Sequence, residues 1–267
     1  MGFLREVTEA TRAAVADPAY LEGLRAPSHE SRPSGLAEAI RAAGRPGALL
    51  VEFKRVSPGS QTPELPVRSA AEFVRETEPA GVVGYSCIAT AYRFRGSPAD
   101  VAALASSTRR PVLFKDFLVD PVQLDAAVRV GAAAVLLIAR LETEGLLTTP
   151  LAELAEGAHS RGLEVLLEFH DKGELRLAAD VAADMYGVNS RDLDSLRMEP
   201  EVARATMLAA DGLRPILGLS GVASAEDARR FWEAGADGLL VGSSVARARD
   251  PTRFLRTLYR PLPGGAR

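Results

Sequence analysis

The fold is decided by the stretch Leu49-Leu50-Val51-Glu52-Phe53-Lys54-Arg55-Val56-Ser57-Pro58-Gly59. It begins as a short apolar run, which is typical of a buried parallel strand, and ends in a loop with charged and hydroxyl side chains. Glu52 and Lys54 are two residues apart, so both point to the same face at the end of this strand. Charges are rarely buried without a partner, because desolvating them is costly. The pair is therefore either a structural ion pair or part of an acid–base site.

From this strand onward, apolar strands alternate with helices. We expect strands over residues 49–53, 82–89, 111–115, 133–139, 163–168, 184–189, 215–219 and 237–241. The expected helices between and after them cover 67–77, 120–131, 143–160, 172–179, 200–209, 224–234 and 251–259, and a further helix begins at Ser97-Pro98. This alternation indicates a parallel sheet, and eight units over about 220 residues fit a closed (β/α)8 TIM barrel of the α/β class. An open doubly wound sheet is the alternative, but the first strand lacks the Gly-x-Gly-x-x-Gly turn of a dinucleotide site.

The chain is expected to form one domain over residues 1–267. Residues 1–45 would be an N-terminal helical extension, because apolar side chains recur at helical spacing over residues 3–24 and a further helix covers 35–43. The barrel would span 48–260, and 261–267 would be a loose tail.

Composition limits the possible functions. A net charge of -3 argues against a nucleic-acid surface, and a charged fraction of 25% with 47% apolar residues is that of an ordinary soluble protein. Cys87 is the only cysteine, which excludes an intrachain disulfide and a thiolate metal cluster. His29, His159 and His170 lack metal-ligand spacing, and no apolar run reaches the length of about 20 residues that spans a membrane. The N-terminus resembles neither a secretory signal nor a transit peptide. We therefore expect a cytoplasmic protein with no metal, no nucleic acid and no membrane partner.

Polar side chains recur where the apolar strands end. They are Glu52, Lys54, Lys115, Glu168 and Asn189. In barrel enzymes the carboxyl ends of the strands carry the chemistry. A salt bridge would explain any one of these residues, but it does not readily explain five at one rim. We predict that they form an acid–base site.

Two small-residue turns follow the last two strands. Ser220-Gly221 comes after the seventh strand and Gly242-Ser243 after the eighth. Barrels often bind phosphate with backbone N–H groups from these two loops, so we expect an anion here, with Ser57 as a further donor. Ordinary tight turns are the alternative. Arg191 is expected either to orient Glu168, to bind a substrate carboxylate, or to lie free at the surface.

These residues also form the motifs of a known family. The matching segments are Glu52-Phe53-Lys54-Arg55-Val56-Ser57-Pro58, Arg110-Pro111-Val112-Leu113-Phe114-Lys115-Asp116-Phe117, Glu168-Phe169-His170-Asp171, Gly187-Val188-Asn189-Ser190-Arg191-Asp192-Leu193, Ser220-Gly221 and Val241-Gly242-Ser243. Over nearly its whole length, including the N-terminal extension, the chain resembles the indole-3-glycerol phosphate synthase family.

The resemblance implies a lyase acting on 1-(2-carboxyphenylamino)-1-deoxyribulose 5-phosphate, a phosphorylated sugar, in tryptophan biosynthesis. The ring carbon bearing the carboxylate attacks the sugar ketone, and carbon dioxide and water leave. No cofactor is implied, since side chains can supply the protons. We expect a monomer or a weak homodimer.

The same resemblance implies a role for each residue. Lys115 would be the general acid at the ketone oxygen, Lys54 would hold the substrate carboxylate, and Glu168 would carry the later proton transfer. Glu52 would pair with the lysines and tune them, whereas Asn189 and Arg191 would position the intermediate. The phosphate would be held by Ser57, Ser220, Gly221, Gly242 and Ser243.

Three departures from the family pattern leave other readings open. Leu219 stands where the family has glutamate, Ala89-Thr90-Ala91 lacks the family's acidic residue, and Gly59-Ser60-Gln61 replaces Ser-Lys-Gly. One alternative is a paralogue that acts on a different arylamine-sugar phosphate. Another is a binding protein that has lost catalysis and serves as a partner subunit, although Lys54, Lys115 and Glu168 are all retained.

Overall fold

The computed structural model describes residues 2–27, 35–44, 47–66 and 68–259. Eight parallel strands close into a barrel in sequence order, with the last strand paired to the first. They are β1 (Ala48–Phe53), β2 (Gly84–Ile88), β3 (Val112–Lys115), β4 (Ala134–Ile138), β5 (Glu164–Phe169), β6 (Met185–Asn189), β7 (Ile216–Leu219) and β8 (Gly238–Val241). The predicted TIM barrel is confirmed, and the predicted strand limits differ from these by one or two residues.

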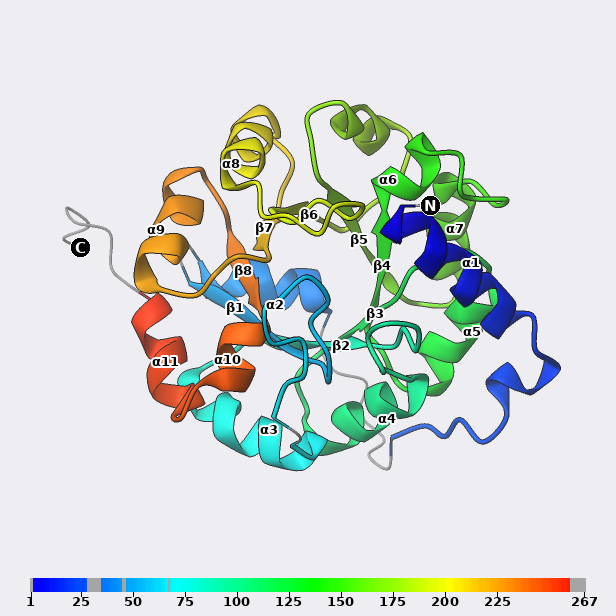
Figure 1. Ribbon diagram of the computed structural model, residues 1–267, viewed down its shortest axis with the longest axis horizontal. Helices are drawn as coiled ribbons and strands as arrows, with labels where there is room; N and C mark the ends of the chain where they lie inside the picture. Colours follow the sequence, from blue (N-terminus) through cyan, green and yellow to red (C-terminus); the bar gives the residue numbers. More distant parts are fainter. Residues whose placement is uncertain (1, 28–34, 45–46, 67, 260–267) are drawn as a thin grey trace.

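Helices surround the barrel (Figure 1). The longer ones are α3 (Ala70–Thr77), α4 (Pro98–Ser107), α5 (Val122–Arg129), α7 (Leu151–Ser160), α8 (Pro200–Ala209), α9 (Ala225–Glu233) and α11 (Pro251–Leu258). Two short helices, α6 (Ala139–Thr143) and α10 (Ser243–Arg247), begin at the ends of β4 and β8. The remaining turns are the 3-10 helices η1 (Pro18–Leu21), η2 (Glu78–Ala80) and η3 (Glu174–Ala179).

Some helix predictions were wrong in detail. The helix expected over 143–160 forms only as α7, because α6 ends at Thr143, Gly145 adopts a left-handed φ of 63° and α7 begins only after Pro150. The helix expected from residue 67 begins at Ala70, where Ser69 forms a capping box with Glu72. The segment 172–179 forms a 3-10 helix that starts at Glu174, and α10 was not predicted.

The alternation of side chains along each strand creates two apolar layers. On β1, Leu49, Val51 and Phe53 belong to the layer between the sheet and the helices. Ala48 and Leu50 belong to the barrel interior, together with side chains such as Leu113 and Leu166. Because side chains on a strand alternate with a period of two, Glu52 continues the inward series at the top of β1. Lys115 follows Leu113 and Glu168 follows Leu166 in the same way.

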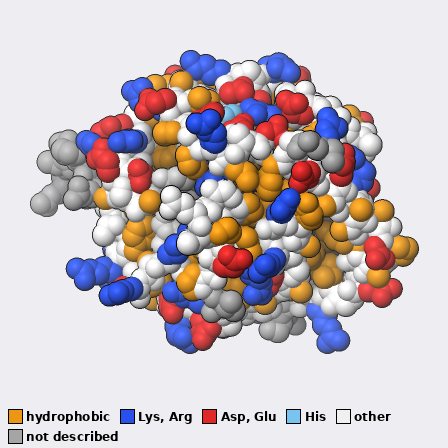
Figure 2. Space-filling view, in the orientation of Figure 1, with side chains coloured by type: hydrophobic (Ala, Val, Ile, Leu, Met, Phe, Trp, Pro, Cys, Tyr) orange, Lys and Arg blue, Asp and Glu red, His pale blue; other side chains and the backbone are white. Residues whose placement is uncertain are grey.

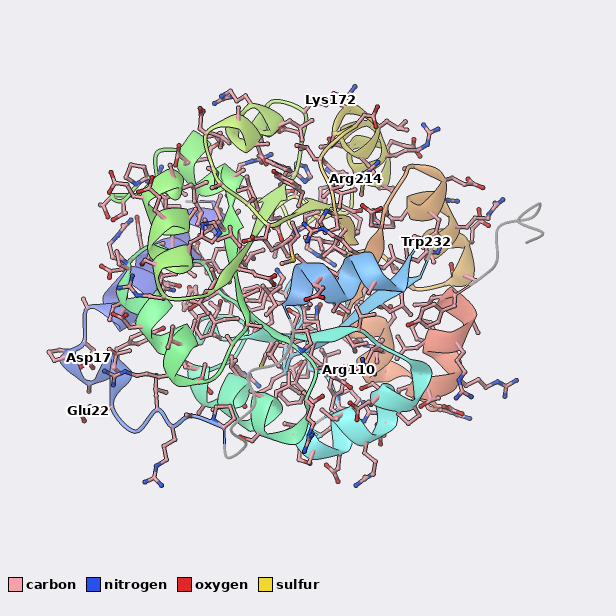
Figure 3. All side chains as sticks on the ribbon, turned by 180° about the vertical axis from the view of Figure 1, so that it is seen from behind. Asp17, Glu22, Arg110, Lys172, Arg214 and Trp232 are labelled. Atoms are coloured by element: carbon pink, nitrogen blue, oxygen red, sulfur yellow. The ribbon has the colours of Figure 1, made fainter. Side chains whose placement is uncertain are left out.

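The N-terminal extension contributes a helix near each end of the barrel. α1 (Phe3–Val15) buries Leu4 and Val7 in the cluster that contains Phe117. α2 (Leu36–Ala43) packs against β1 at the opposite end of the barrel, which is the end seen in Figure 3. There the Glu164 carboxylate accepts the Ala37 N–H. The helical extension is thus present, whereas the exact domain limits stay a prediction and the tail over 261–267 lies outside the described residues. No helix in the described ranges is long and apolar enough to cross a membrane.

Candidate active site

A cavity of about 360 Å³ opens at the carboxyl ends of the strands. Its lining includes every residue predicted from the sequence for the site: Glu52, Lys54, Ser57, Lys115, Glu168, Asn189, Arg191, Ser220, Gly221, Gly242 and Ser243. Apolar side chains extend across the middle of this face of the molecule, between charged side chains toward its edge (Figure 2). The barrel thus brings residues that are nearly 200 positions apart in sequence into one site.

One wall of the cavity carries a closed ion pair. Lys54 Nζ lies 2.6 Å from Glu52 Oε1, as their spacing on β1 predicts. Gly242 makes room for this pair, because a Cβ at that position would lie 2.8 Å from Glu52 Oε1 and 3.0 Å from Lys54 Nζ. Burial by itself raises the pKa of Glu52, but Lys54 and Lys115 outweigh it and bring this pKa below its usual value. Glu52 is therefore an anion at neutral pH.

The opposite wall carries a looser pair. Lys115 Nζ lies 3.6 Å from Glu168 Oε2, and this oxygen is buried without a hydrogen bond. The other carboxylate oxygen, Glu168 Oε1, accepts a hydrogen bond of 2.9 Å from Asn189 Nδ2. Burial lowers the pKa of Lys115, but Glu168 and Glu52 raise it more, so Lys115 is an ammonium at neutral pH. The open contact leaves both Lys115 and Glu168 able to exchange a proton with a bound molecule.

Arg191 adds a third cation to the lining. Its Nη1 donates to the Leu196 carbonyl at 2.7 Å. Burial lowers the pKa of Arg191, and the charge of Glu52 opposes this only in part. Within the described part of the chain, no carboxylate lies within ion-pairing distance of the Arg191 guanidinium. A ligand carboxylate would supply that missing partner.

Hydroxyl groups gather between β1 and β8. Ser243 Oγ donates to Ser57 Oγ at 2.9 Å, and Ser60 Oγ donates to the same oxygen at 3.1 Å. Beside them, Ser220 and Gly221 adopt left-handed φ angles of 63° and 80°, which turn the chain sharply at the end of β7. Such a turn presents backbone N–H groups and a hydroxyl to the cavity, and these groups suit an anion.

The remaining lining is apolar and aromatic. Phe94 contacts Phe3 and Phe117, with ring centroids 6.2 Å and 6.0 Å apart. Leu219 lies among these apolar residues of the lining and is 1% exposed. The cavity therefore has a charged part, a hydroxyl-rich part and a part that suits an aromatic ring.

Sequence reasoning missed one group of lining residues. Asp116 lines the cavity and is 4% exposed, and Thr90 Oγ1 donates to its Oδ1 at 2.6 Å. Burial raises the pKa of Asp116 to about 6, although Thr90, Gln123 and the Phe117 N–H donate hydrogen bonds to it. The signal in the sequence that could have identified Asp116 is its position directly after Lys115. His170, in contrast, is buried behind the cavity rather than in its lining.

Together, these features of the cavity define a class of protein. A TIM barrel whose carboxyl-end cavity combines ammonium groups, carboxylates and an anion-binding turn is an enzyme for acid–base chemistry on an anionic small molecule. A family model described as indole-3-glycerol phosphate synthase matches residues 4–258. The chain belongs to the indole-3-glycerol phosphate synthase family. It is a carboxy-lyase of tryptophan biosynthesis.

Individual relatives agree with this assignment. An indole-3-glycerol phosphate synthase from Halobacterium salinarum is 38% identical over 211 residues, which cover 78% of this chain and 80% of the relative. The same enzyme from an Exiguobacterium species is 37% identical over 210 residues, which cover 79% of this chain and 81% of the relative.

Solved structures support the fold alone. A 3-hexulose-6-phosphate synthase matches 79% of this chain and 97% of its own with a TM-score of 0.62 at 15% identity. Thiamine phosphate pyrophosphorylase from Pyrococcus furiosus matches 81% and 95% with a TM-score of 0.58 at 19% identity.

Proposed function

We propose that this cavity converts 1-(2-carboxyphenylamino)-1-deoxyribulose 5-phosphate to indole-3-glycerol phosphate, in the cytoplasm, as a monomer or weak homodimer. The observation that carries the proposal is the open contact between Lys115 and Glu168, which faces a second ammonium, Lys54, across one cavity. The reaction needs protons to be given and taken at neighbouring atoms, and this pair offers both an acid and a base.

Binding uses the three parts of the cavity. The phosphate is held by the hydroxyls of Ser57 and Ser243 and by the turns at Ser220-Gly221 and Gly242. The aromatic ring lies against Phe94 and Phe117. The carboxylate of the substrate is held by Lys54 and Arg191, whose guanidinium has no carboxylate partner among the described residues.

The first step forms the new ring. The ring carbon that bears the carboxylate attacks the ketone carbon, and Lys115 gives a proton to the ketone oxygen as it becomes a hydroxyl. Carbon dioxide then leaves, and the electrons of the broken bond restore the aromatic ring. Glu52 stays ionised throughout and stabilises the two ammonium groups.

The second step removes water. Glu168 takes a proton from the carbon next to the nitrogen, while the hydroxyl leaves as water with a proton from a lysine ammonium. Asn189 holds Glu168 through its side-chain amide. Two protons are given and one is recovered, so the reaction takes one proton from solvent, as conversion of a carboxylate to carbon dioxide requires.

The test uses the purified protein and this substrate, with indole fluorescence as the readout. We expect turnover by the wild type, and a loss of about 10³-fold or more in kcat for Lys115→Ala with KM nearly kept. Lys172→Ala is the matched control, because Lys172 is exposed at the periphery of the barrel (Figure 3). A wild type without turnover would refute the function, and a Lys115→Ala variant near the wild-type rate would refute the role of Lys115.

A second candidate is a paralogue that acts on a different arylamine-sugar phosphate. The buried, apolar Leu219 at the end of β7 favours it, because this lining surface offers no charge to the ligand. Leu219→Glu separates the two candidates. If Leu219→Glu acts faster than the wild type on 1-(2-carboxyphenylamino)-1-deoxyribulose 5-phosphate, the paralogue is supported. If it acts more slowly on this substrate, the first proposal is supported.

A further inference from the structure

His170 lies two residues beyond Glu168, buried behind the wall of the cavity. Its imidazole sits between the end of β6 and the start of α8. Nδ1 lies 3.0 Å from the backbone oxygen of Asn189, and Nε2 lies 3.0 Å from Glu199 Oε2. The side chain is 6% exposed, so these two contacts are largely shielded from water.

The partners of the ring determine which nitrogens carry protons. A backbone carbonyl only accepts hydrogen bonds, so Nδ1 must be a donor. Nε2 faces the Glu199 carboxylate, which is also an acceptor, and Asp192 Oδ2 lies 3.8 Å away. Both ring nitrogens thus lie against acceptors, and Nδ1 is the one that contacts the Asn189 backbone.

Other charged groups around the ring hold its neighbours in place. Glu174 accepts the backbone N–H of His170 at 2.7 Å and also pairs with Arg140. Arg140 in turn binds Asp192 at 3.1 Å and Asp171 at 2.9 Å. The ring is therefore held by partners at the end of β6, in the β6–α8 loop and at the start of α8, while Glu174 on η3 holds the backbone of His170.

Asn189 connects this ring to the site. Its Oδ1 accepts the Arg191 N–H at 2.9 Å, and its Nδ2 donates to Glu168 Oε1 at 2.9 Å. Since Glu168 Oε2 has no hydrogen bond, the orientation of the Glu168 carboxylate depends largely on Asn189. A shift of the Asn189 peptide would turn its side chain and carry the Glu168 carboxylate with it.

We infer that His170 is a positioning residue, which holds the Asn189 carbonyl through Nδ1 and thereby aims Glu168 at the atom whose proton it takes. The inference rests on the proposed function, because it concerns the proton transfer at Glu168. Misplacing a reacting group by a fraction of an ångström slows chemistry without weakening binding at the phosphate and carboxylate contacts.

Two substitutions separate the contacts of the ring. The amide nitrogen of asparagine reaches the position of Nδ1, whereas that of glutamine reaches the position of Nε2. We expect His170→Asn to keep kcat within about threefold of the wild type, and His170→Gln to lose about 10- to 100-fold in kcat with KM within about twofold. A purely structural role would lower kcat equally in both variants, in step with their melting temperatures. Equal losses, or a greater loss in His170→Asn, would overturn the inference.

Controls separate this inference from the function itself. His159→Asn changes a half-exposed histidine that pairs with Asp184 outside the cavity, and kcat should stay unchanged. If the His170 variants do not fold, Glu199→Ala removes only the Nε2 contact, and kcat should stay within about threefold of the wild type at unchanged KM. A loss of more than about tenfold in Glu199→Ala would then overturn the inference, because Nε2 rather than Nδ1 would govern the position of Glu168. A wild type without turnover would refute the proposed function and this inference together, whereas an active wild type with equal His170 variants refutes the inference alone.

Discussion

Glu52 on β1 and Asp116 at the end of β3 are two carboxylates of one cavity with opposite behaviour. Both are 4% exposed. Burial raises the pKa of each, but Lys54 and Lys115 bring the pKa of Glu52 below its usual value, whereas the pKa of Asp116 rises to about 6. Among the residues that the structure describes, the hydrogen-bond donors to Asp116 are neutral: Thr90, Gln123 and the Phe117 N–H. The two carboxylates are thus equally buried, but their pKa values shift in opposite directions. The charge of the neighbouring groups decides the direction of the shift.

The difference assigns the two carboxylates different tasks. Glu52 stays ionised throughout the neutral range, and its charge helps to raise the pKa of Lys115, which keeps Lys115 protonated and ready to act as an acid. Asp116, whose pKa is raised to about 6, instead changes its protonation state within the range in which Glu52 stays ionised. Three substitutions test this contrast: two change a partner of one carboxylate, and one replaces the Asp116 carboxylate itself.

The largest expected effect follows from removing the cation beside Glu52. Lys54→Met leaves a buried carboxylate without its ion-pair partner, which should cost about 4 kcal/mol of unfolding free energy at pH 7. Glu52 has a lowered pKa in the folded wild type, so its stabilising contribution is present above the unfolded value of 4.5 and is lost as pH falls through the folded value. The deficit of the variant should therefore shrink below pH 4.5, as measured by urea denaturation at pH 7 and pH 3.

Lys172→Met is the control for this variant, since it removes an exposed lysine and should leave stability unchanged. A deficit in Lys54→Met that is the same at pH 7 and pH 3 would contradict the electrostatic explanation, because it would mean that the lost packing of the alkyl chain is responsible.

The contrast also shows how far the sequence reaches. The period of two along β1 places Glu52 in the inward series, and the same rule finds Lys115 and Glu168, so the barrel and its charged rim are predictable. Asp116 directly follows Lys115, and strict alternation puts it on the opposite face. The chain leaves the strand at this point and turns Asp116 into the cavity, which a strand pattern cannot indicate.

Long-range pairing is the other part that the sequence does not reveal. Some partners come from another strand, as Asn189 on β6 does for Glu168 on β5, so these contacts depend on a register that only the closed barrel defines. His170 illustrates the same limit. Its position two residues after Glu168 suggests an inward side chain, yet the ring lies behind the wall because Asn189 and Glu199 hold it there.

A middle-sized effect should follow from removing the titration of Asp116. A carboxylate whose folded pKa is about 6 binds its proton more tightly in the folded state, so the wild type loses stability as pH rises from about 4 to about 6. Relative to Asp116→Asn, this loss should amount to about 3 kcal/mol, since the shift spans about two pKa units. Denaturation of both proteins at pH 4, 5, 6 and 7 measures it.

Asp211→Asn provides the matched control for the Asp116 variant, because the Asp211 side chain is 94% exposed. Its stability difference from the wild type should not change over this range. A flat difference between the wild type and Asp116→Asn would show that Asp116 titrates at an ordinary value, and the contrast with Glu52 would then disappear.

The smallest effect should follow from weakening one neutral partner of Asp116. Thr90→Val keeps the shape of the side chain but removes the hydroxyl that donates to Asp116 Oδ1. A hydrogen bond to the charged form of a carboxyl lowers its pKa, so removing this hydroxyl should raise the pKa of Asp116 further. At pH values above this raised pKa, the variant should lose about 2 kcal/mol of unfolding free energy relative to the wild type. Below pH 4 the carboxyl is neutral in both proteins, and the cost should be much smaller.

Thr90→Ser keeps the hydroxyl and should behave like the wild type at both ends of the range. If Thr90→Val lowers the unfolding free energy by the same amount at every pH, the hydroxyl matters for packing alone. The hydrogen bond from Thr90 would then have no effect on the pKa of Asp116.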